Sequence, residues 1–167
     1  CQQLGETEQF FRVLHGLNAY HNLRAEWQTA CAVAEQMLQL AQNQSDPIFR
    51  VSAHYLLGNT LFFLGEFSAA REHFEQGYLL YNPQHHPAYL QLYGQDEGVV
   101  CLANLAWTLW FLGYPDQALE LGHKALKQAQ MLNHPLSLAI ANSYVANIYL
   151  SRQEEHVAQQ HAQEVIR

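Results

Sequence analysis

Apolar residues recur along this chain at the spacing of one face of an α-helix. Between Val99 and Gln130 they mark two stripes, one on each side of Gly113-Tyr114-Pro115. The first stripe consists of Leu102, Leu105, Ala106, Leu109 and Leu112, and the second of Ala118, Leu119, Ala125 and Leu126. A glycine at positive φ can end the first helix, and Pro115 can begin the second. This stretch is therefore predicted to form a helical hairpin.

The same unit recurs along the chain. Its clearest marker is an alanine in the second helix of each unit, at intervals of 40, 48 and 40 residues: Ala30, Ala70, Ala118 and Ala158. The position eight residues further on is apolar in every unit: Leu38, Tyr78, Leu126 and Ile166. Agreement between several such columns predicts a repeat array. No segment alternates with period two for long enough to form a strand, so the predicted fold class is all-α.

Four hairpins are predicted, at about residues 8–42, 47–81, 96–132 and 135–167. Asp46 suits the N-cap of a helix that begins at Pro47, and Asp96 suits the N-cap of the third hairpin. The stretch 82–98 contains two prolines and two glycines and is predicted to be an irregular loop. The hairpins are predicted to form one domain, residues 1–167. Because the chain begins at Cys1 and stops inside a helical pattern, we expect it to be a fragment of a longer protein.

These residues resemble the tetratricopeptide repeat (TPR) family. The family pattern of W-x2-L-G-x2-Y and A-x3-F is matched best at Leu57, Gly58, Ala70 and Phe74. His54 stands in place of the Trp, the closing Pro is missing, and the period exceeds the family's roughly 34 residues. The resemblance implies a right-handed α-solenoid of about four TPR-like hairpins, in which the first helix of each hairpin lines a concave groove.

A narrower resemblance covers the run from Leu80 to Leu119 and the segment from Leu132 to Ala139. Both are similar to the C-terminal repeat region of bacterial signalling proteins that join a cyclase or kinase domain to a STAND/AAA-type ATPase domain. This resemblance implies a cytoplasmic signalling or regulatory role, with any catalysis in other domains. It also leaves open a ligand role for His85-His86 near Asp96.

Helical register identifies the residues that would line the groove. The first unit contributes Arg12, His15, Ala19 and Asn22. The predicted partner-binding site in the other units consists of Tyr55, Asn59, Phe62, Phe63, Trp107, Trp110, Phe111 and Asn147. The family's clamp for a peptide carboxylate needs Lys and Arg, and only Arg12 is basic here. The groove is therefore predicted to be aromatic and amide-bearing. Whether neighbouring helices or a partner cover Trp107 and Trp110 is left open.

Charge and composition exclude several classes of partner. The chain has 8 Lys and Arg against 15 Asp and Glu, a net charge of −7, so it lacks the basic stripe that nucleic acid needs. No apolar run approaches the ~20 residues of a membrane span. The three cysteines, Cys1, Cys31 and Cys101, have no paired spacing and are predicted to be small core residues in a reducing compartment.

The sequence offers little catalytic or metal-binding chemistry. Ten histidines are present, but the close pairs lack the i, i+4 spacing of helical zinc ligands, so no metal or cofactor is predicted. Ser137 and Ser143 lack a nucleophile elbow, and no phosphate-binding glycine loop is present. We therefore predict that the chain is not an enzyme.

Two functions remain. The first is an interaction module that binds a peptide or partner domain through the groove, with self-association through an open repeat end near Val165 and Ile166. The second is a small-ligand sensor that controls an attached ATPase or cyclase. A closed cavity of roughly 300–1,000 Å³ would favour the sensor, and an open trough would favour the interaction module.

Overall fold

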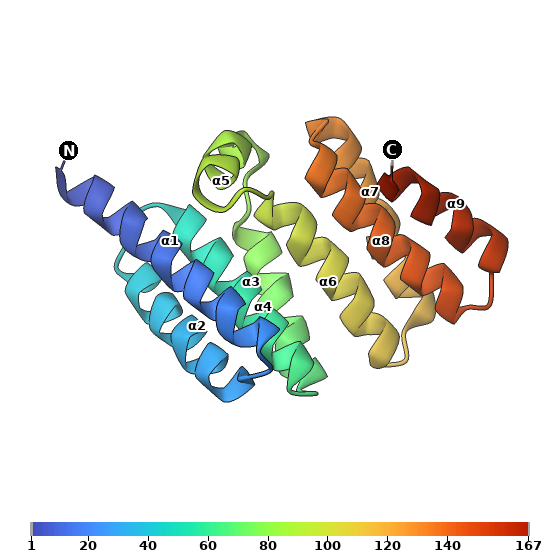
Figure 1. Ribbon diagram of the computed structural model, residues 1–167, viewed down its shortest axis with the longest axis horizontal. Helices are drawn as coiled ribbons and strands as arrows, with labels where there is room; N and C mark the ends of the chain where they lie inside the picture. The colour runs from blue at the N-terminus through green and yellow to red at the C-terminus, as the bar shows by residue number, and fades with distance from the viewer. Residues whose placement is uncertain (1, 167) are drawn as a thin grey trace. The chain divides into compact units, whose positions relative to one another are not determined.

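The computed structural model describes residues 2–166, with side chains described for residues 7–165. Among these residues all the regular structure is helical and no strand is present. The elements in chain order are α1 (Gln2–Leu23), α2 (Trp27–Gln42), α3 (Pro47–Phe63), α4 (Phe67–Leu80), the 3-10 helix η1 (Pro83–His85), α5 (His86–Tyr93), α6 (Glu97–Phe111), α7 (Pro115–Leu132), α8 (Pro135–Ser151) and α9 (Glu155–Ile166) (Figure 1). No helix in this part of the chain is long and apolar enough to span a membrane.

The chain divides into two compact units, Cys1–Glu97 and Gly98–Arg167. In the first unit α2 packs against α1 and α3, and α3 packs against α4. Helix α1 also contacts α3 and α5, so α1 and α3 lie next to each other. In the second unit α8 packs between α7 and α9. Each unit is thus built from antiparallel helix pairs joined by short turns.

All four hairpin turns share one geometry. At the end of α3, Gly65 has a φ of 84°, the Glu66 amide donates to the Leu61 carbonyl, and the Gly65 amide donates to the Phe62 carbonyl. This pair of bonds is the Schellman motif, in which a residue in the left-handed region ends the helix. The other three turns repeat both bonds around Ala25, Gly113 and Gln153, which have φ values of 57°, 85° and 64°. The positive φ predicted at Gly113 is confirmed.

These turns predict opposite effects for matched substitutions. Alanine at positive φ is strained, so Ala25→Gly should raise the free energy of unfolding by about 0.5–1 kcal/mol. Gly113 is unstrained at its positive φ, and Gly113→Ala introduces the strain that Ala25 already carries. This substitution should lower the free energy of unfolding by about 1 kcal/mol. Urea denaturation followed by circular dichroism measures both changes. Equal signs for the two substitutions would contradict the shared turn geometry.

The repeated alanines lie where helices meet. Ala30, Ala70 and Ala118 are fully buried, and Ala158 is nearly so. Gly58 allows a close approach of α4 to α3, because a Cβ added there would lie 2.9 Å from the ring of Phe74. The repeat pattern therefore marks positions where a larger side chain has no room.

The segment between the second and third hairpins differs from the sequence-based prediction. The irregular loop predicted at 82–98 is wrong, because these residues form η1 and α5. Asn82 caps η1 by accepting a hydrogen bond from the Gln84 amide, and Gly94 ends α5 with a φ of 73°. The prolines that suggested a loop stand instead in the first turns of these helices, where the missing amide hydrogen has no cost.

Candidate functional site

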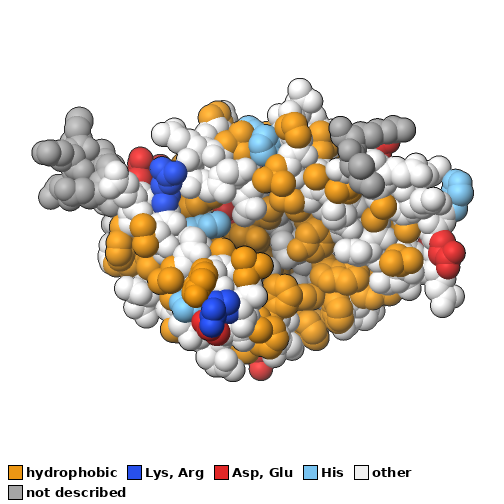
Figure 2. Space-filling model, viewed as in Figure 1, with side chains coloured by type: hydrophobic (Ala, Val, Ile, Leu, Met, Phe, Trp, Pro, Cys, Tyr) orange, Lys and Arg blue, Asp and Glu red, His pale blue; other side chains and the backbone are white. Residues whose placement is uncertain are grey.

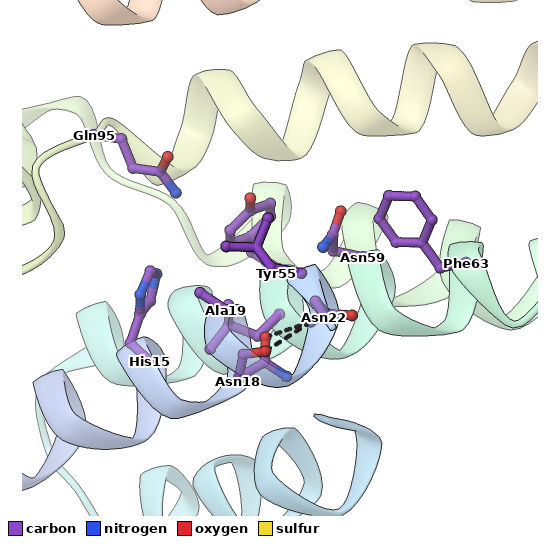
Figure 3. A pocket seen from close by; sticks show the side chains of 10 residues that line it. His15, Asn18, Ala19, Asn22, Tyr55, Asn59, Phe63 and Gln95 are labelled. Carbon is purple, nitrogen blue, oxygen red and sulfur yellow. Dashed lines mark hydrogen bonds between the residues drawn. The ribbon is translucent and has the colours of Figure 1, made fainter. Parts of the chain in front are cut away.

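A pocket of about 300 Å³ lies along α1 and α3 in the first unit. Figure 3 shows His15 rising from α1, with Tyr55, Asn59 and Phe63 rising from α3 toward the same side. Gln95, from the segment that precedes α6, points toward them. The full lining is His15, Asn18, Ala19, Asn22, Leu23, Tyr55, Leu56, Asn59, Phe63 and Gln95. The pocket is open to solvent and combines amide, aromatic and aliphatic side chains.

The floor of the pocket is a hydrogen-bonded network. Asn18 is fully buried, and its Nδ2 donates to the Ala30 carbonyl at 2.8 Å and to Thr60 Oγ1 at 3.3 Å. Asn22 Nδ2 donates to Asn18 Oδ1 at 2.9 Å and to Thr60 Oγ1 at 3.1 Å. Thr60 Oγ1 in turn donates to the Leu56 carbonyl at 2.9 Å. These bonds fix the Asn22 amide, so its orientation is set before any ligand arrives.

Two amide groups of the pocket have unused hydrogen-bonding capacity. Asn22 Oδ1 is buried and has no hydrogen-bond partner among the described residues. Asn59 makes no hydrogen bond to any residue that the structure describes, so its carbonyl and its NH₂ are both available. An amide can accept and donate at the same time, as a peptide backbone does. The pocket therefore presents a donor–acceptor pair at Asn59, while the Asn22 oxygen lies buried in its floor.

No Lys, Arg, Asp or Glu is among the residues that line the pocket. One lining residue contacts an acidic group outside the lining: His15 Nε2 is 3.4 Å from Oε1 of the fully buried Glu97. Burial raises the pKa of the Glu97 carboxyl, with the His15 contact opposing that shift. The His15 ring also stacks on Tyr93, with 4.6 Å between centroids. This cluster orients His15 at the edge of a pocket whose lining carries no fixed charge.

A second buried carboxylate stabilises the segment beside the pocket. Asp96 accepts a hydrogen bond from Tyr81 Oη at 3.0 Å and pairs with His86 Nδ1 at 2.8 Å. Asp96 was expected to cap α6, and these bonds connect it to the end of α4 and to the start of α5. His86, considered as a ligand residue from the sequence, thus makes a structural contact.

The predicted groove residues of the first unit are distributed as follows. Tyr55, Asn59 and Phe63 line the pocket together with the register positions His15, Ala19 and Asn22. Phe62 does not line it, because its ring packs against Phe67 with 5.3 Å between centroids. Arg12 is exposed on α1 and is also absent from the lining.

The other four predicted residues belong to the second unit. Trp107 and Trp110 are half-buried, and the Trp107 ring meets Phe111 edge to face at 5.2 Å between centroids. Phe111 is 50% exposed, and Asn147 is exposed on α8. These four residues therefore keep accessible surface within their unit.

Several important residues were missed at the sequence level. Asn18, Gln95 and Glu97 were not identified, although they form the floor, the edge and the buried acid of this site. Asn18 stands four residues before Asn22, and this spacing on one helix face could have indicated that their side chains are hydrogen-bonded. Nothing in the local sequence indicates that Glu97 packs against His15, since 82 positions separate them in the chain.

A histidine pair links α3 and α4 elsewhere in the first unit. The Nδ1 atoms of His54 and His73 lie 3.0 Å apart, a distance at which one ring donates and the other accepts. Burial, followed by the charges of His73 and Arg50, lowers the pKa of His54 to about 4, and burial lowers that of His73. The described residues contain no group of three or more His, Cys, Asp or Glu side chains that could hold a metal ion.

This pair predicts a loss of stability in acid. Both histidines stay neutral in the folded chain but protonate near pH 6.5 when it unfolds, so the unfolded state binds more protons below that pH. The two neutral histidines contribute fully to the free energy of unfolding above about pH 6.5, and this contribution is lost as the pH falls toward about 4. We expect the melting temperature to fall over this window, and to fall less for His73→Gln.

The comparison with His73→Gln is needed because Glu97 changes the stability with pH in the direction opposite to the histidine pair. Its raised pKa adds stability at low pH that is lost as the pH rises. Only the difference between the two pH profiles reports the histidine pair. Parallel profiles would show that the two rings do not share a neutral hydrogen bond.

Self-association was predicted through an open repeat end near Val165 and Ile166. A second pocket of about 530 Å³ lies at the start of α8 and the end of α9, lined by Asn133, Pro135, Leu136, Leu138, Ala139, Glu164 and Val165. Val165 is exposed there, whereas the side chain of Ile166 and residues Cys1 and Arg167 lie outside the described residues. Of the cysteines, Cys101 is buried, Cys31 is half-buried, and neither forms a disulfide within the described residues. The expectation for Cys1 lies outside the described residues.

Comparison with known proteins identifies the repeat. Residues 51–76 and 99–121 match the tetratricopeptide repeat family. Two segments of the chain thus match the model of this repeat. The matched segments fall in α3–α4 and α6–α7, the two hairpins with glycine in their turns. Tetratricopeptide repeats generally mediate protein–protein interactions and are typically non-catalytic. A comparison with curated protein sequences finds no match.

Solved structures support the same fold. The chain is similar to the crystal structure of BtubC (BKLC) from P. vanneervenii, with a TM-score of 0.69 and 19% identity over 91% of this chain. It spans 60% of the BtubC chain. Two crystal structures of a proposed Podosopora anserina kinesin light chain with nearly identical TPR-like repeats give TM-scores of 0.42, at 16% and 17% identity over 95% of this chain and 94% and 93% of theirs. The predicted all-α fold of TPR-like hairpins is confirmed by the BtubC similarity together with the repeat matches.

Proposed function

We propose that this chain is a non-catalytic interaction module that binds an extended peptide segment of a partner protein along the inner faces of α1 and α3. The observation that carries this proposal is an open pocket of amide and aromatic side chains in which the Asn59 amide makes no hydrogen bond to any described residue. Backbone groups of a bound peptide can pair with both its carbonyl and its NH₂.

The chemistry of the pocket fits a peptide backbone better than a charged group. Asn59 can accept from one peptide N–H and donate to the neighbouring carbonyl, which holds an extended strand in register. Phe63 and Leu23 flank the amides with exposed apolar surface that takes up peptide side chains. The lining has no fixed charge, so the pocket does not select a peptide terminus or a phosphate.

The second unit contributes a separate contact surface in this proposal. Trp107, Trp110, Phe111 and Asn147 offer the same combination of aromatic and amide groups as the first unit. We propose that both units act as one interaction domain, with these residues contacting a further part of the partner. Large aromatic side chains of this kind provide most of the binding energy where they are buried by a partner.

A small ligand is the alternative occupant. The pocket volume of about 300 Å³ is at the lower limit for small-molecule sites. Its open form favours the peptide, since small-molecule sites bury most of their ligand's surface. In the alternative function a ligand bound here would regulate an attached ATPase or cyclase domain.

The setting of the module is also a proposal. The resemblance of residues 80–119 and 132–139 to bacterial cyclase, kinase and STAND/AAA ATPase proteins supports a regulatory role in bacterial signalling. We propose that the module lies in the cytoplasm, where partner proteins and attached enzyme domains would be accessible.

Selection from a random peptide library on the 167-residue chain tests the function. We expect enrichment of peptides that have apolar side chains and no common charge. Fluorescence anisotropy of a selected peptide should give a dissociation constant that changes less than about threefold between about 50 and 500 mM salt, because no charged residue lines the pocket. Enrichment of uniformly acidic or basic peptides with a steep salt dependence would contradict the proposal.

A further inference from the structure

Helix α1 carries an exposed apolar seam on the side away from the pocket. The seam consists of Phe10, Val13, Leu17 and Tyr20, which are 46%, 64%, 40% and 52% exposed. Their spacing of three, four and three residues is the a/d pattern of a coiled coil, which forms a narrow stripe along one helix face. Figure 2 shows hydrophobic side chains gathered along the near face of α1.

The other faces of α1 are already occupied. Phe11, Leu14 and Asn18 are buried against the first unit, while His15, Ala19 and Asn22 face the pocket or its floor. At 100° per residue, the centre of the seam lies on the opposite side of the helix from His15. The seam is therefore a third, separate surface of α1 that the described part of the first unit leaves open.

We propose that the seam binds the seam of a second copy of this chain, in antiparallel orientation about a two-fold axis that passes through the seam at the level of position 15. In this register Phe10 of one copy meets Tyr20 of the second, and Val13 meets Leu17. Both pairs occur twice, as an isologous interface requires. Each pair joins side chains of similar kind, aromatic with aromatic and aliphatic with aliphatic, so the seam is complementary to itself.

The size and charge of the seam fit a second copy. The four side chains leave about 400 Å² of apolar surface open per copy, comparable to the largest patch on a typical monomer. Two copies would bury about 800 Å² from the seam, which is the size of a weak and transient interface. No charged residue lies within the seam. At its C-terminal end, Cζ of Arg24 lies 5.5 Å from the centroid of the Tyr20 ring.

Dimerisation through this face would leave both pockets open. A dimer would then present two peptide sites on opposite sides of the paired helices, which raises the avidity for a partner with two segments. This inference goes beyond the proposed function and does not depend on it, since the seam and the pocket share no residue.

Sedimentation equilibrium of the 167-residue chain, at about 5–500 µM, tests the interface. We expect a reversible monomer–dimer equilibrium with a dissociation constant in the micromolar range. Val13→Glu places a charge in the seam and should raise the constant at least about tenfold. The matched control is Leu79→Glu on α4, which is also apolar and 75% exposed but off the seam, and should leave the constant unchanged.

A charge pair tests the register. Val13→Glu and Leu17→Lys should each dimerise at least about tenfold more weakly alone, and an equimolar mixture should form a tighter heterodimer, because position 13 of one copy meets position 17 of the other. A mixture that dimerises no more tightly than the single variants overturns the antiparallel register. A wild-type chain that is monomeric up to about 500 µM, or a dissociation constant that Val13→Glu leaves unchanged, overturns the proposal. Circular dichroism of each variant confirms that its helices are intact.

Discussion

Phe74→Ala should lower the free energy of unfolding of the first unit by about 3–5 kcal/mol. The Phe74 side chain is 0% exposed and lies on α4 against Gly58 of α3. Removing the ring deletes buried apolar surface and leaves a cavity that two rigid helices cannot close. Leu79→Ala, on the same helix but 75% exposed, should change the free energy by less than about 0.5 kcal/mol. Urea denaturation followed by circular dichroism measures both.

Gly58→Ala makes this prediction more specific. The new methyl group would lie 2.9 Å from the Phe74 ring, so the single substitution should cost about 1–3 kcal/mol by overpacking. In the Phe74→Ala background the methyl group enters the cavity, and its cost should vanish or change sign. A double-mutant cycle measures this coupling. Additive effects would show that Gly58 and Phe74 are not in contact and that the hairpin register is wrong.

Asn59→Ala should weaken the binding of a library-selected peptide by about five- to tenfold, or about 1–1.4 kcal/mol. The Asn59 amide has no intramolecular partner among the described residues, so its loss removes only bonds to the ligand. The free energy of unfolding should stay within about 0.5 kcal/mol of wild type for the same reason. Fluorescence anisotropy and urea denaturation on the same preparations separate binding from stability.

The control for Asn59→Ala is Gln76→Ala, which removes an exposed amide from the outer helix α4. It should leave the affinity unchanged. Equal losses for the two variants, or no loss for Asn59→Ala, would mean that the peptide does not contact the inner face of α3. If a small ligand is the true occupant, the selection should yield no peptide that competes for this face.

The periodic part of the fold could be predicted from the sequence. Helical stripes and the alanine columns place the hairpins, because burial on one helix face imposes a fixed spacing on the sequence. Gly65 and Gly113 mark two of the four turns, since glycine adopts positive φ without strain. The other two turns hold Ala25 and Gln153 in the same conformation, and there the tertiary packing of the hairpin overrides the local preference.

The sequence predicts which residues lie on the inner face of α3, but it does not predict which of them a neighbouring helix covers. A period of 3.6 residues places Tyr55, Asn59 and Phe63 on one side of α3, and the structure places all three in the pocket. Phe62 is one residue, or 100°, away from Phe63 and turns toward α4 instead. Spacing alone cannot show which side of the stripe a neighbouring helix covers.

Contacts between distant segments were not accessible from the sequence. His54 and His73 belong to different helices, and their pairing depends on how far α3 and α4 are offset. The packing of Glu97 against His15 depends on α5, the helix that was taken for a loop. Prolines and glycines predict breaks in regular structure, and here they mark the ends of short helices.

The peptide-binding site can be tested most directly by NMR on the 167-residue chain with a library-selected peptide. The side-chain NH₂ signals of Asn22 and Asn59 should shift on binding, and intermolecular NOEs should connect the peptide to Tyr55 and Phe63. This result would place an extended peptide along α1 and α3, with its backbone bonded to the Asn59 amide and packed over Asn22. A saturated complex in which these signals do not move, with NOEs only to other surfaces of the chain, would contradict the account.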